Sequence, residues 1–237
     1  MCGRFTLHTE KEALAERFHF DPGALGVLGP RYNVAPTDPV LALRAAGEGC
    51  EPKLMRWGLV PPFAKGVGDL PLMINARIET LAKKSPFRES LRAQRCLVPA
   101  DGFFEWQAAG AKNRRIPHLI SRADGQPFAM AGLFAEWRRR DDLFGETLLS
   151  CTIVTTAANE AVSPLHDRMP VILPREAEMR WLDPSLDGDT PALLALLQPV
   201  TAAELRVFPV SRRVNSVKND DASLIARDDS EPSLGFF

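Results

Sequence analysis

The chain starts Met1-Cys2-Gly3-Arg4, which places a cysteine where unusual chemistry is available. A small second residue is the usual condition for methionine removal, and removal would leave Cys2 with an α-amine beside its thiol. The amine can condense with an aldehyde, and the thiol can then close onto the imine carbon in an intramolecular step, with an effective molarity of ~10⁵ M or more. An α-amino group, with a pKa of roughly 7.7–8.0, is partly neutral at physiological pH. On these letters alone, the commoner interpretation is that Cys2 is simply part of a buried first strand.

Glu105 lies in the aromatic segment Gly102-Phe103-Phe104-Glu105-Trp106. On a strand, its side chain points to the face opposite Phe104 and Trp106. Exposure to solvent is the commoner fate of such a glutamate. If Glu105 instead lines a cleft, partial loss of solvent would raise its pKa toward neutrality and make it a usable general acid.

Two other segments carry polar candidates. Asn75 and Arg77 stand two residues apart. Asn75 is either a turn or helix-capping residue or an amide that orients an amine. Arg77 is either a surface charge or a cation that binds phosphate. His166 precedes Asp167. A loop histidine can be idle, and Asp167 assists it only if the two side chains turn toward each other, which sequence neighbours rarely do.

The net charge does not indicate a nucleic-acid partner, because the chain has 29 Lys and Arg residues against 30 Asp and Glu residues. A DNA-binding surface must therefore be a local patch. One candidate patch surrounds an expected helix and consists of Lys83, Lys84, Arg88, Arg92 and Arg95. Its arginines recur at i, i+4 and i+7 and so share a face. This face is by default a solvated surface; the more specific hypothesis is that it follows phosphates.

The composition, with 45% hydrophobic and 25% charged residues, is that of an ordinary globular protein. No apolar run approaches the roughly 20 residues of a membrane span, and the first residues lack the pattern of a signal peptide. We therefore expect a cytoplasmic protein without a membrane partner. The four cysteines and four histidines show no ligand spacing, so we expect no metal and no cofactor.

Short strands and tight turns dominate the pattern. Thr9 and Glu12 predict a capping box for a helix ending near Phe18, and Ser85-Pro86 predicts a helix ending near Gln94. Further short helices are expected at 175–181 and 191–197, and strands at 3–8, 40–44, 53–59, 96–99, 102–106, 116–121, 128–137, 147–156 and 205–210. Without βαβ alternation the class is α+β, a single domain over 2–226 of mainly antiparallel strands forming a barrel-like or bifurcated sheet with peripheral helices. Residues 227–237 are expected to form a polar, flexible tail.

Seven segments, taken in order, resemble the SOS response-associated peptidase (SRAP) family. They are Met1-Cys-Gly-Arg-Phe, Arg31-Tyr-Asn-Val-Ala-Pro-Thr, Trp57-Gly-Leu-Val-Pro, Ile74-Asn-Ala-Arg-Ile-Glu-Thr, Leu97-Val-Pro-Ala-Asp-Gly-Phe-Phe-Glu-Trp, His166-Asp-Arg-Met-Pro, and Pro209-Val-Ser with Val214-Asn-Ser-Val-Lys-Asn. Each is weak alone, but their shared order over the chain to about residue 220 is specific.

The resemblance implies a sensor of abasic sites in single-stranded DNA, including junctions between single and double strands. The terminal cysteine of this family forms a thiazolidine with the ring-opened sugar aldehyde and leaves a stable DNA–protein crosslink. Carried over by matching segments, Cys2 is the nucleophile and Asn75 positions its amine. Glu105 is the acid and base, and His166 assists at the sugar or its phosphate.

The same resemblance implies DNA contacts. Arg4 and Arg77 match arginines that contact phosphate. Trp57 would pack against bases or support the DNA groove. Phe63 stands where relatives commonly carry tryptophan, and either ring can stack on a base, although the departure puts the detailed wedge at a strand junction in doubt.

Two other functions stay open. An N-terminal-nucleophile cysteine amidohydrolase or peptidase would use the amine as a base for the thiol, and class II glutamine amidotransferases also begin Met-Cys-Gly, although no glutamine-binding segment is recognisable here. The family name likewise implies a proteolytic step, and imine chemistry admits an AP-lyase activity. A non-catalytic single-strand-binding module would leave Cys2 incidental. We expect the protein to be a monomer.

Overall fold

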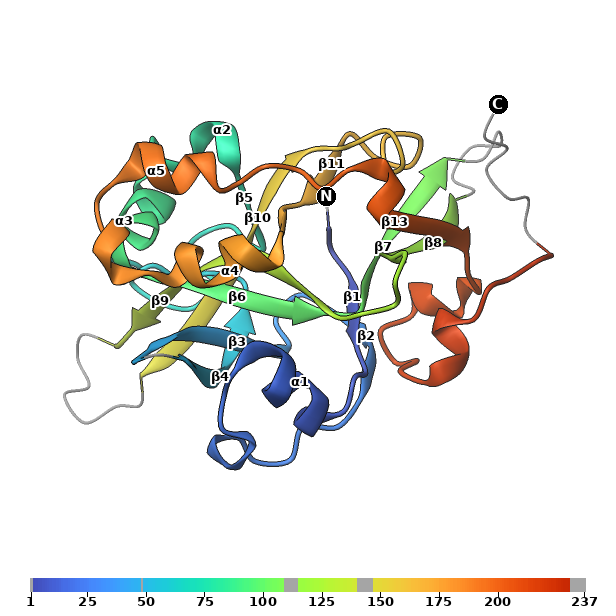
Figure 1. The fold of residues 1–237 in the computed structure, drawn as a ribbon, viewed down its shortest axis with the longest axis horizontal. Helices are drawn as coiled ribbons and strands as arrows, with labels where there is room; N and C mark the ends of the chain where they lie inside the picture. Colours follow the sequence, from blue (N-terminus) through green and yellow to red (C-terminus); the bar gives the residue numbers. More distant parts are fainter. Residues whose placement is uncertain (1, 48, 109–114, 140–146, 231–237) are drawn as a thin grey trace.

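The computed structural model describes residues 2–47, 49–108, 115–139 and 147–230, and its strands form two sheets (Figure 1). The first is an open sheet in the order β13-β8-β7-β1-β2, with antiparallel neighbours throughout. Its strands are β1 (Phe5–Leu7), β2 (Arg31–Val34), β7 (Gly102–Ala108), β8 (Arg115–Arg122) and β13 (Leu205–Pro209).

The second sheet contains a closed barrel, because β10 pairs with both β4 and β9 in the cycle β10-β4-β3-β6-β9. These strands are β3 (Pro39–Ala46), β4 (Gly49–Trp57), β6 (Arg95–Ala100), β9 (Phe128–Trp137) and β10 (Leu148–Ala157). Three short strands extend it: β5 (Asn75–Arg77), β11 (Arg168–Pro170) and β12 (Ile172–Leu173). Only the pairings of β10 with β4 and β5 are parallel among the described strands. The expected α+β class with a barrel is confirmed.

The helices lie at the periphery (Figure 1). They are α1 (Lys11–Phe18), α2 (Ile78–Leu81), α3 (Ser85–Ala93), α4 (Arg175–Leu182) and α5 (Thr190–Ala195). Short 3₁₀ turns occupy Pro22–Ala24, Pro184–Leu186, Ala202–Glu204, Arg212–Asn215 and Ala222–Ile225.

The expected capping box at Thr9 is wrong. Helix α1 begins at Lys11 with Glu10 as its N-cap, and no side chain caps it. The Thr9 hydroxyl instead donates to Asp101, whose carboxylate also accepts from the backbone amides of His8 and Thr9. Asp101 therefore fixes the end of β1 to the turn before β7, and this bond replaces the local cap.

The open sheet has a buried group on each face. On one face Phe103 joins the main core with Cys2 and Phe5, and on the other Phe104 packs in a smaller cluster with Leu119. Because side chains alternate along a strand, Glu105 points to the same face as Phe103. The register of β7 thus turns Glu105 toward the start of the chain.

Asn33 ties the first strands to the C-terminal segment. Its Oδ1 accepts from Arg4 at 2.8 Å, and its Nδ2 lies 3.2, 3.0 and 2.8 Å from the carbonyl oxygens of Val214, Ser216 and Asn219. We call this group the Asn33 clasp. Since Arg4 is two residues from Cys2, the clasp sets the course of the chain as it approaches β1.

The C-terminal segment stays paired beyond the clasp. Val210 forms an antiparallel bridge with Arg227, and the Asp228 amide donates to the Pro209 carbonyl. Residues 231–237 of the expected tail lie outside the described residues. Within the described ranges, no helix combines the length and the hydropathy that crossing a bilayer requires.

Candidate active site

Cys2 is fully buried in the main core, three residues before β1 begins at Phe5. Its carbonyl oxygen accepts a hydrogen bond of 2.8 Å from Asn75 Nδ2. Asn75 opens β5, which pairs with β10 and places Asn75 opposite Ile153 at the barrel edge. The Asn75 Oδ1 is also buried, and it has no hydrogen-bond partner within the described residues. An acceptor next to the Cys2 backbone is suited to hold an amine on that residue.

Glu105 is buried, with 3% of its surface exposed, so the commoner interpretation of an exposed glutamate is wrong. Burial raises the pKa of Glu105 to about 7. Burial, followed by the nearby Glu105 carboxylate, raises the pKa of the Cys2 thiol well above its usual range. The site therefore holds a carboxyl that can exchange a proton at neutral pH beside a thiol that stays protonated.

His166 lies between β10 and β11, with its side chain about one third exposed. Its Nδ1 is 2.7 Å from Asp167 Oδ1 and accepts from the Arg168 amide at 2.9 Å. The two contacts are alternatives, because the amide needs an unprotonated Nδ1 and the carboxylate favours a protonated one. Burial lowers the pKa of His166, which favours the amide bond and leaves the proton on Nε2. The side chains of His166 and Asp167 do turn toward each other, as help from Asp167 would require.

Two charged residues near this group, Arg115 and Arg168, were not singled out from the sequence. The charges of Asp167 and Arg115 act on both Glu105 and His166. Arg115 opens β8 and gave no signal, since it follows a basic run typical of a surface loop. Arg168 pairs with Glu79 and donates to the Thr155 carbonyl at 2.6 Å. The only feature of the sequence that pointed to Arg168 was its place in the segment that begins at His166.

Arg77 and Arg4 differ in what their side chains can reach. Arg77 is exposed at the end of β5, opposite Thr155. Arg4 is half-buried and donates to Asn33 Oδ1 and the Val214 carbonyl at 2.8 and 2.9 Å. Part of its hydrogen-bonding capacity is therefore used inside the Asn33 clasp, so a phosphate contact by Arg4 remains a prediction, and Arg77 is the more accessible of the two.

Trp57 cannot stack on a base, because it is fully buried. Its ring packs edge-on against Phe5 with centroids 5.2 Å apart, and its Nε1 donates to the Ile74 carbonyl at 2.9 Å. Trp57 thus supports the residue before Asn75, and its expected support of the DNA groove stays a prediction. Phe63 in the following loop is exposed, as are Val67 and Leu72, so stacking by Phe63 remains a prediction.

One of the five residues expected to form a basic face around α3 is buried. Arg88 and Arg92 are exposed, but Arg95 is buried and donates to the carbonyls of Trp181 and Asp183 and to the Asp187 carboxylate. The i+7 position falls on β6, after α3 has ended at Ala93. The helix-periodic pattern therefore continued past the end of the helix.

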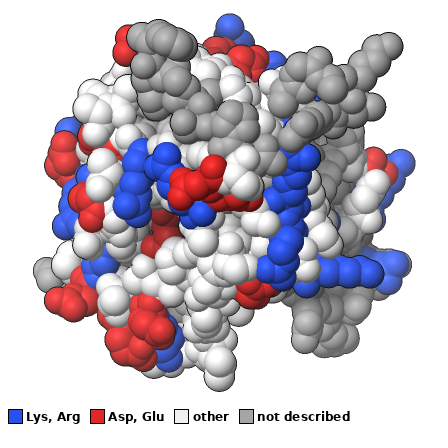
Figure 2. Space-filling model, turned by 90° about the vertical axis from the view of Figure 1, so that its right-hand side faces the viewer, with Lys and Arg blue, Asp and Glu red and all other residues white. Residues whose placement is uncertain are grey.

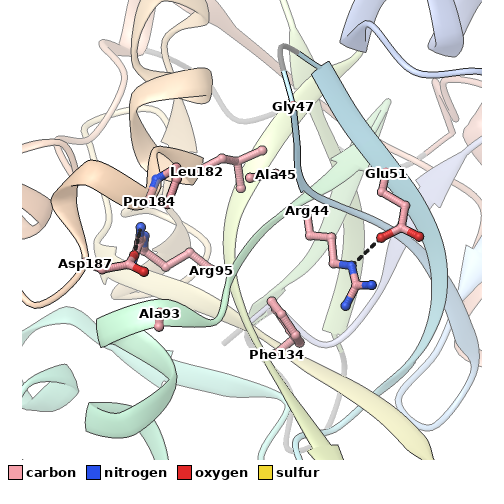
Figure 3. Close-up of a pocket in the computed structure, with 10 residues that line it drawn as sticks. All are labelled: Arg44, Ala45, Gly47, Glu51, Ala93, Arg95, Phe134, Leu182, Pro184 and Asp187. Atoms are coloured by element: carbon pink, nitrogen blue, oxygen red, sulfur yellow. Dashed lines mark hydrogen bonds and ion pairs between the residues drawn. The ribbon is translucent and has the colours of Figure 1, made fainter.

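Arg95 also lines a surface pocket of about 500 Å³ (Figure 3). Its charged groups are paired with each other, Arg95 with Asp187 and Arg44 with Glu51. None of the lining residues belongs to β1, β5 or β7. This pocket is therefore separate from the group around Cys2.

The face that carries β7, β8 and β13 shows Lys and Arg side chains gathered in bands, with acidic side chains beside them (Figure 2). Positive charge on this face is thus local, as the nearly balanced composition requires. In the part of the chain that the structure describes, no three His, Cys, Asp or Glu side chains are grouped as metal ligands.

Comparisons with known proteins agree with these features. A family model described as SOS response associated peptidase (SRAP) matches residues 1–217. The chain is 42% identical over 226 residues to the abasic site processing protein YoqW of Bacillus subtilis (strain 168), covering 95% of this chain and 99% of that protein. It is 37% identical over 234 residues to the abasic site processing protein YedK of Escherichia coli (strain K12), with 95% and 99% covered. An X-ray structure of a protein from Bacteroides thetaiotaomicron superimposes with a TM-score of 0.84 at 26% identity, covering 96% of this chain and 100% of that one. This chain belongs to the SOS response associated peptidase (SRAP) family.

Proposed function

We propose that this protein recognises abasic sites in single-stranded DNA and crosslinks to them through Cys2, shielding the lesion as a thiazolidine. The observation that carries the proposal is the grouping at Cys2, where Asn75 holds the Cys2 carbonyl and the buried Glu105 acts on its thiol. The names of the relatives YoqW and YedK support an abasic site as the substrate. The protein would act as a monomer in the cytoplasm, on the nucleoid when bound to DNA.

The chemistry runs from the amine to the thiol. After removal of Met1, the Cys2 amine adds to the C1′ aldehyde of the opened sugar. The resulting hydroxyl leaves as water with a proton from Glu105, and the imine forms. Cys2 Sγ then adds to the imine carbon while its proton passes to the nitrogen, so one C–N bond and one C–S bond form and one water is released. The raised pKa of the Cys2 thiol suits this order. A protonated thiol is a weak nucleophile, so the amine adds to the aldehyde first.

Other activities are tied to the same intermediate. An imine at C1′ acidifies the adjacent C2′ proton, so strand cleavage by β-elimination, an AP-lyase activity, would compete with ring closure. A peptidase activity would be restricted to the bond before Cys2. A hydrolase that attacks with a thiolate fits less well, since both burial and Glu105 disfavour the thiolate.

Intact-mass measurement with an oligonucleotide that contains one abasic site tests the proposal. The expected product is the protein without Met1 plus the oligonucleotide minus one water. Cys2→Ser keeps the amine but not the thiol, so its adduct should require borohydride for trapping and should be lost on heating. Cys50→Ser, at another buried cysteine, is the matched control and should crosslink like the wild type.

Two results would overturn the proposal. One is a heat-stable adduct of the Cys2→Ser variant, because the thiol would then not close the ring. The other is normal crosslinking by a protein that keeps an extra residue before Cys2, because no free amine would then be available on that cysteine.

A further inference from the structure

Glu79 and Arg168 form an ion pair that the mechanism above does not use. The Arg168 guanidinium binds both carboxylate oxygens of Glu79, Oε1 through Nη1 and Oε2 through Nη2, the latter at 3.1 Å. Nη2 also donates to the Thr155 carbonyl at 2.6 Å. Only 11% of the Arg168 side chain is exposed. A bidentate pair of this kind fixes the direction of both side chains. We call the three groups the Arg168 clamp.

The clamp joins two segments that carry candidate site residues. Glu79 lies on α2, which follows directly after β5, the strand that begins at Asn75. Arg168 opens β11, two residues after His166. Strand β10 lies between β5 and β11 (Figure 1), since one of its residues, Thr155, pairs with both strands. The Arg168 side chain therefore links the segment of Asn75 to the segment of His166 across β10.

The backbone of Arg168 acts directly on the His166 ring. Its amide donates to His166 Nδ1 at 2.9 Å, so in the neutral ring Nδ1 is the acceptor and Nε2 carries the proton. Asp167 Oδ1 lies 2.7 Å from the same Nδ1 and favours a proton there instead. The amide can hold Nδ1 only while Arg168 stays in place. The clamp therefore stabilises one of the two arrangements open to this ring.

We propose that Glu79 is a positioning residue for His166, and that it acts through Arg168 by keeping the Arg168 amide on Nδ1, so that Nε2 can donate a hydrogen bond to the opened sugar or its phosphate. The proposal rests on the proposed function and on the expected part of His166 in it. The same link holds His166 in place relative to Asn75, and so relative to the Cys2 backbone that Asn75 binds.

Several charged groups also act on the His166 ring. Burial lowers its pKa, and the charges of the terminal amine, Arg115 and Arg168 lower it further, whereas the Asp167 carboxylate raises it. Glu79→Gln leaves all of these groups in the protein. A change of the ring in this variant therefore reports on the position of Arg168 and not on the loss of its charge.

The first test is ¹⁵N NMR of the His166 ring in the DNA-free protein. The neutral ring of the wild type should show one unprotonated nitrogen, Nδ1, and one protonated nitrogen, Nε2. In Glu79→Gln and Arg168→Met the two signals should move toward each other, because the tautomers mix once the amide is displaced. Adding Glu79→Gln to Arg168→Met should change nothing further, since the pair is already broken. Glu89→Gln, which breaks a surface ion pair on α3, is the control and should leave the ring signals unchanged.

The second test separates rate from binding in single-turnover crosslinking with an abasic oligonucleotide. Glu79→Gln should lower the maximal rate about tenfold, because His166 loses its orientation. The DNA concentration that gives half of the maximal rate should stay the same or fall, because the substitution removes a negative charge that acts on Arg77. In the Arg168→Met background, Glu79→Gln should have no further effect on the rate.

Three results would overturn the proposal. They are a His166 tautomer that is indifferent to Glu79→Gln, additive effects of the two substitutions, and a loss of rate that higher DNA concentration restores, which would place the pair in DNA binding. Because the NMR test needs no DNA, it decides the role of Glu79 even if the wild type forms no crosslink, a result that would contradict only the proposed function. Glu79→Gln also decides both tests if Arg168→Met fails to fold, since the Glu79 side chain is half exposed.

Discussion

Glu105 and Asn75 contribute different things to Cys2, and substitutions can separate them. Glu105, with a pKa of about 7, is close to half protonated at physiological pH and can both give and take a proton. Asn75 has no titration and acts through geometry, by holding the Cys2 carbonyl at 2.8 Å. We therefore expect changes at Glu105 to alter pH dependence and changes at Asn75 to alter rate alone.

Glu105→Gln should change how stability depends on pH. The folded pKa of about 7 lies above the ordinary value of 4.5, so the folded protein holds this proton more tightly than the unfolded chain does. The stability from this group is present below about pH 4.5 and is lost as the pH rises through about 7. Between those values the wild type should lose on the order of 3 kcal/mol relative to the variant, measured by urea unfolding.

The control for this measurement is Glu51→Gln. Hydrogen bonds from Lys53 and Arg44 lower the pKa of Glu51, so any effect of its removal has the opposite sign and is small at this partly exposed position. Parallel stability curves for the wild type and Glu105→Gln would show that burial does not perturb the carboxyl.

Asn75→Leu should slow adduct formation by about 10²-fold, because the amine and carbonyl of Cys2 lose their orientation. DNA affinity should be nearly unchanged, since Asn75 bonds to the protein's own backbone. The rate should keep the wild-type pH profile, and single-turnover crosslinking across the pH range measures both. A shifted profile would instead place Asn75 in proton transfer.

At the scale of elements, the Asn33 clasp joins β1 and β2 to the C-terminal segment. Asn33→Leu would leave buried carbonyls and the Arg4 guanidinium without their partner, at about 1–3 kcal/mol for each unsatisfied group. We expect a drop in the free energy of unfolding on the order of 3 kcal/mol and slower crosslinking by the folded fraction. Asn219→Ala removes one side-chain bond to the Arg213 carbonyl and keeps the backbone carbonyl that Asn33 binds, so it is the control; equal losses in both variants would argue against the clasp.

The sequence predicted the long strands but not the short strands β5, β11 and β12. The apolar run over Phe128–Trp137, between the turn at Asp124-Gly125 and a charged segment, located β9 with the same bounds. The three-residue strands β5 and β11 exist only because β10 offers them an edge, and no local pattern reports a distant edge. The prolines after Trp57 correctly indicated a loop, but the burial of Trp57 depends on Phe5, far away in sequence.

The candidate site was predictable in its members and not in its contacts. The ordered segments indicated Cys2, Asn75, Glu105 and His166, whereas the bond from Asn75 to Cys2 joins residues 73 positions apart. The face to which Glu105 points depends on the register of β7 against β8, which composition and spacing do not determine. The sequence therefore did not predict the contacts between residues that lie far apart in the chain.

At the scale of the whole molecule, DNA binding must rely on local charge, because the formal net charge is −1. Arg77→Ala should weaken binding to undamaged single strands and flatten the slope of log K against log salt by about 0.7, as one phosphate contact is lost. Arg44→Ala, in the pocket away from Cys2 and paired with Glu51, should leave the slope unchanged. Equal slopes for the wild type and Arg77→Ala would make Arg77 a structural residue.

The burial of Cys2 also bears on when Met1 can be removed during synthesis. The residues that enclose its backbone and thiol come much later in the chain, Asn75 on β5 and Glu105 on β7. At roughly 5–20 residues per second, the ribosome needs several seconds or more to reach them. During that interval the start of the chain is open to an aminopeptidase, whereas Cys2 is buried once the strands have paired. The proposed chemistry of Cys2 is therefore best served if Met1 leaves before folding ends, and a cell short of aminopeptidase should then contain folded protein that forms less crosslink.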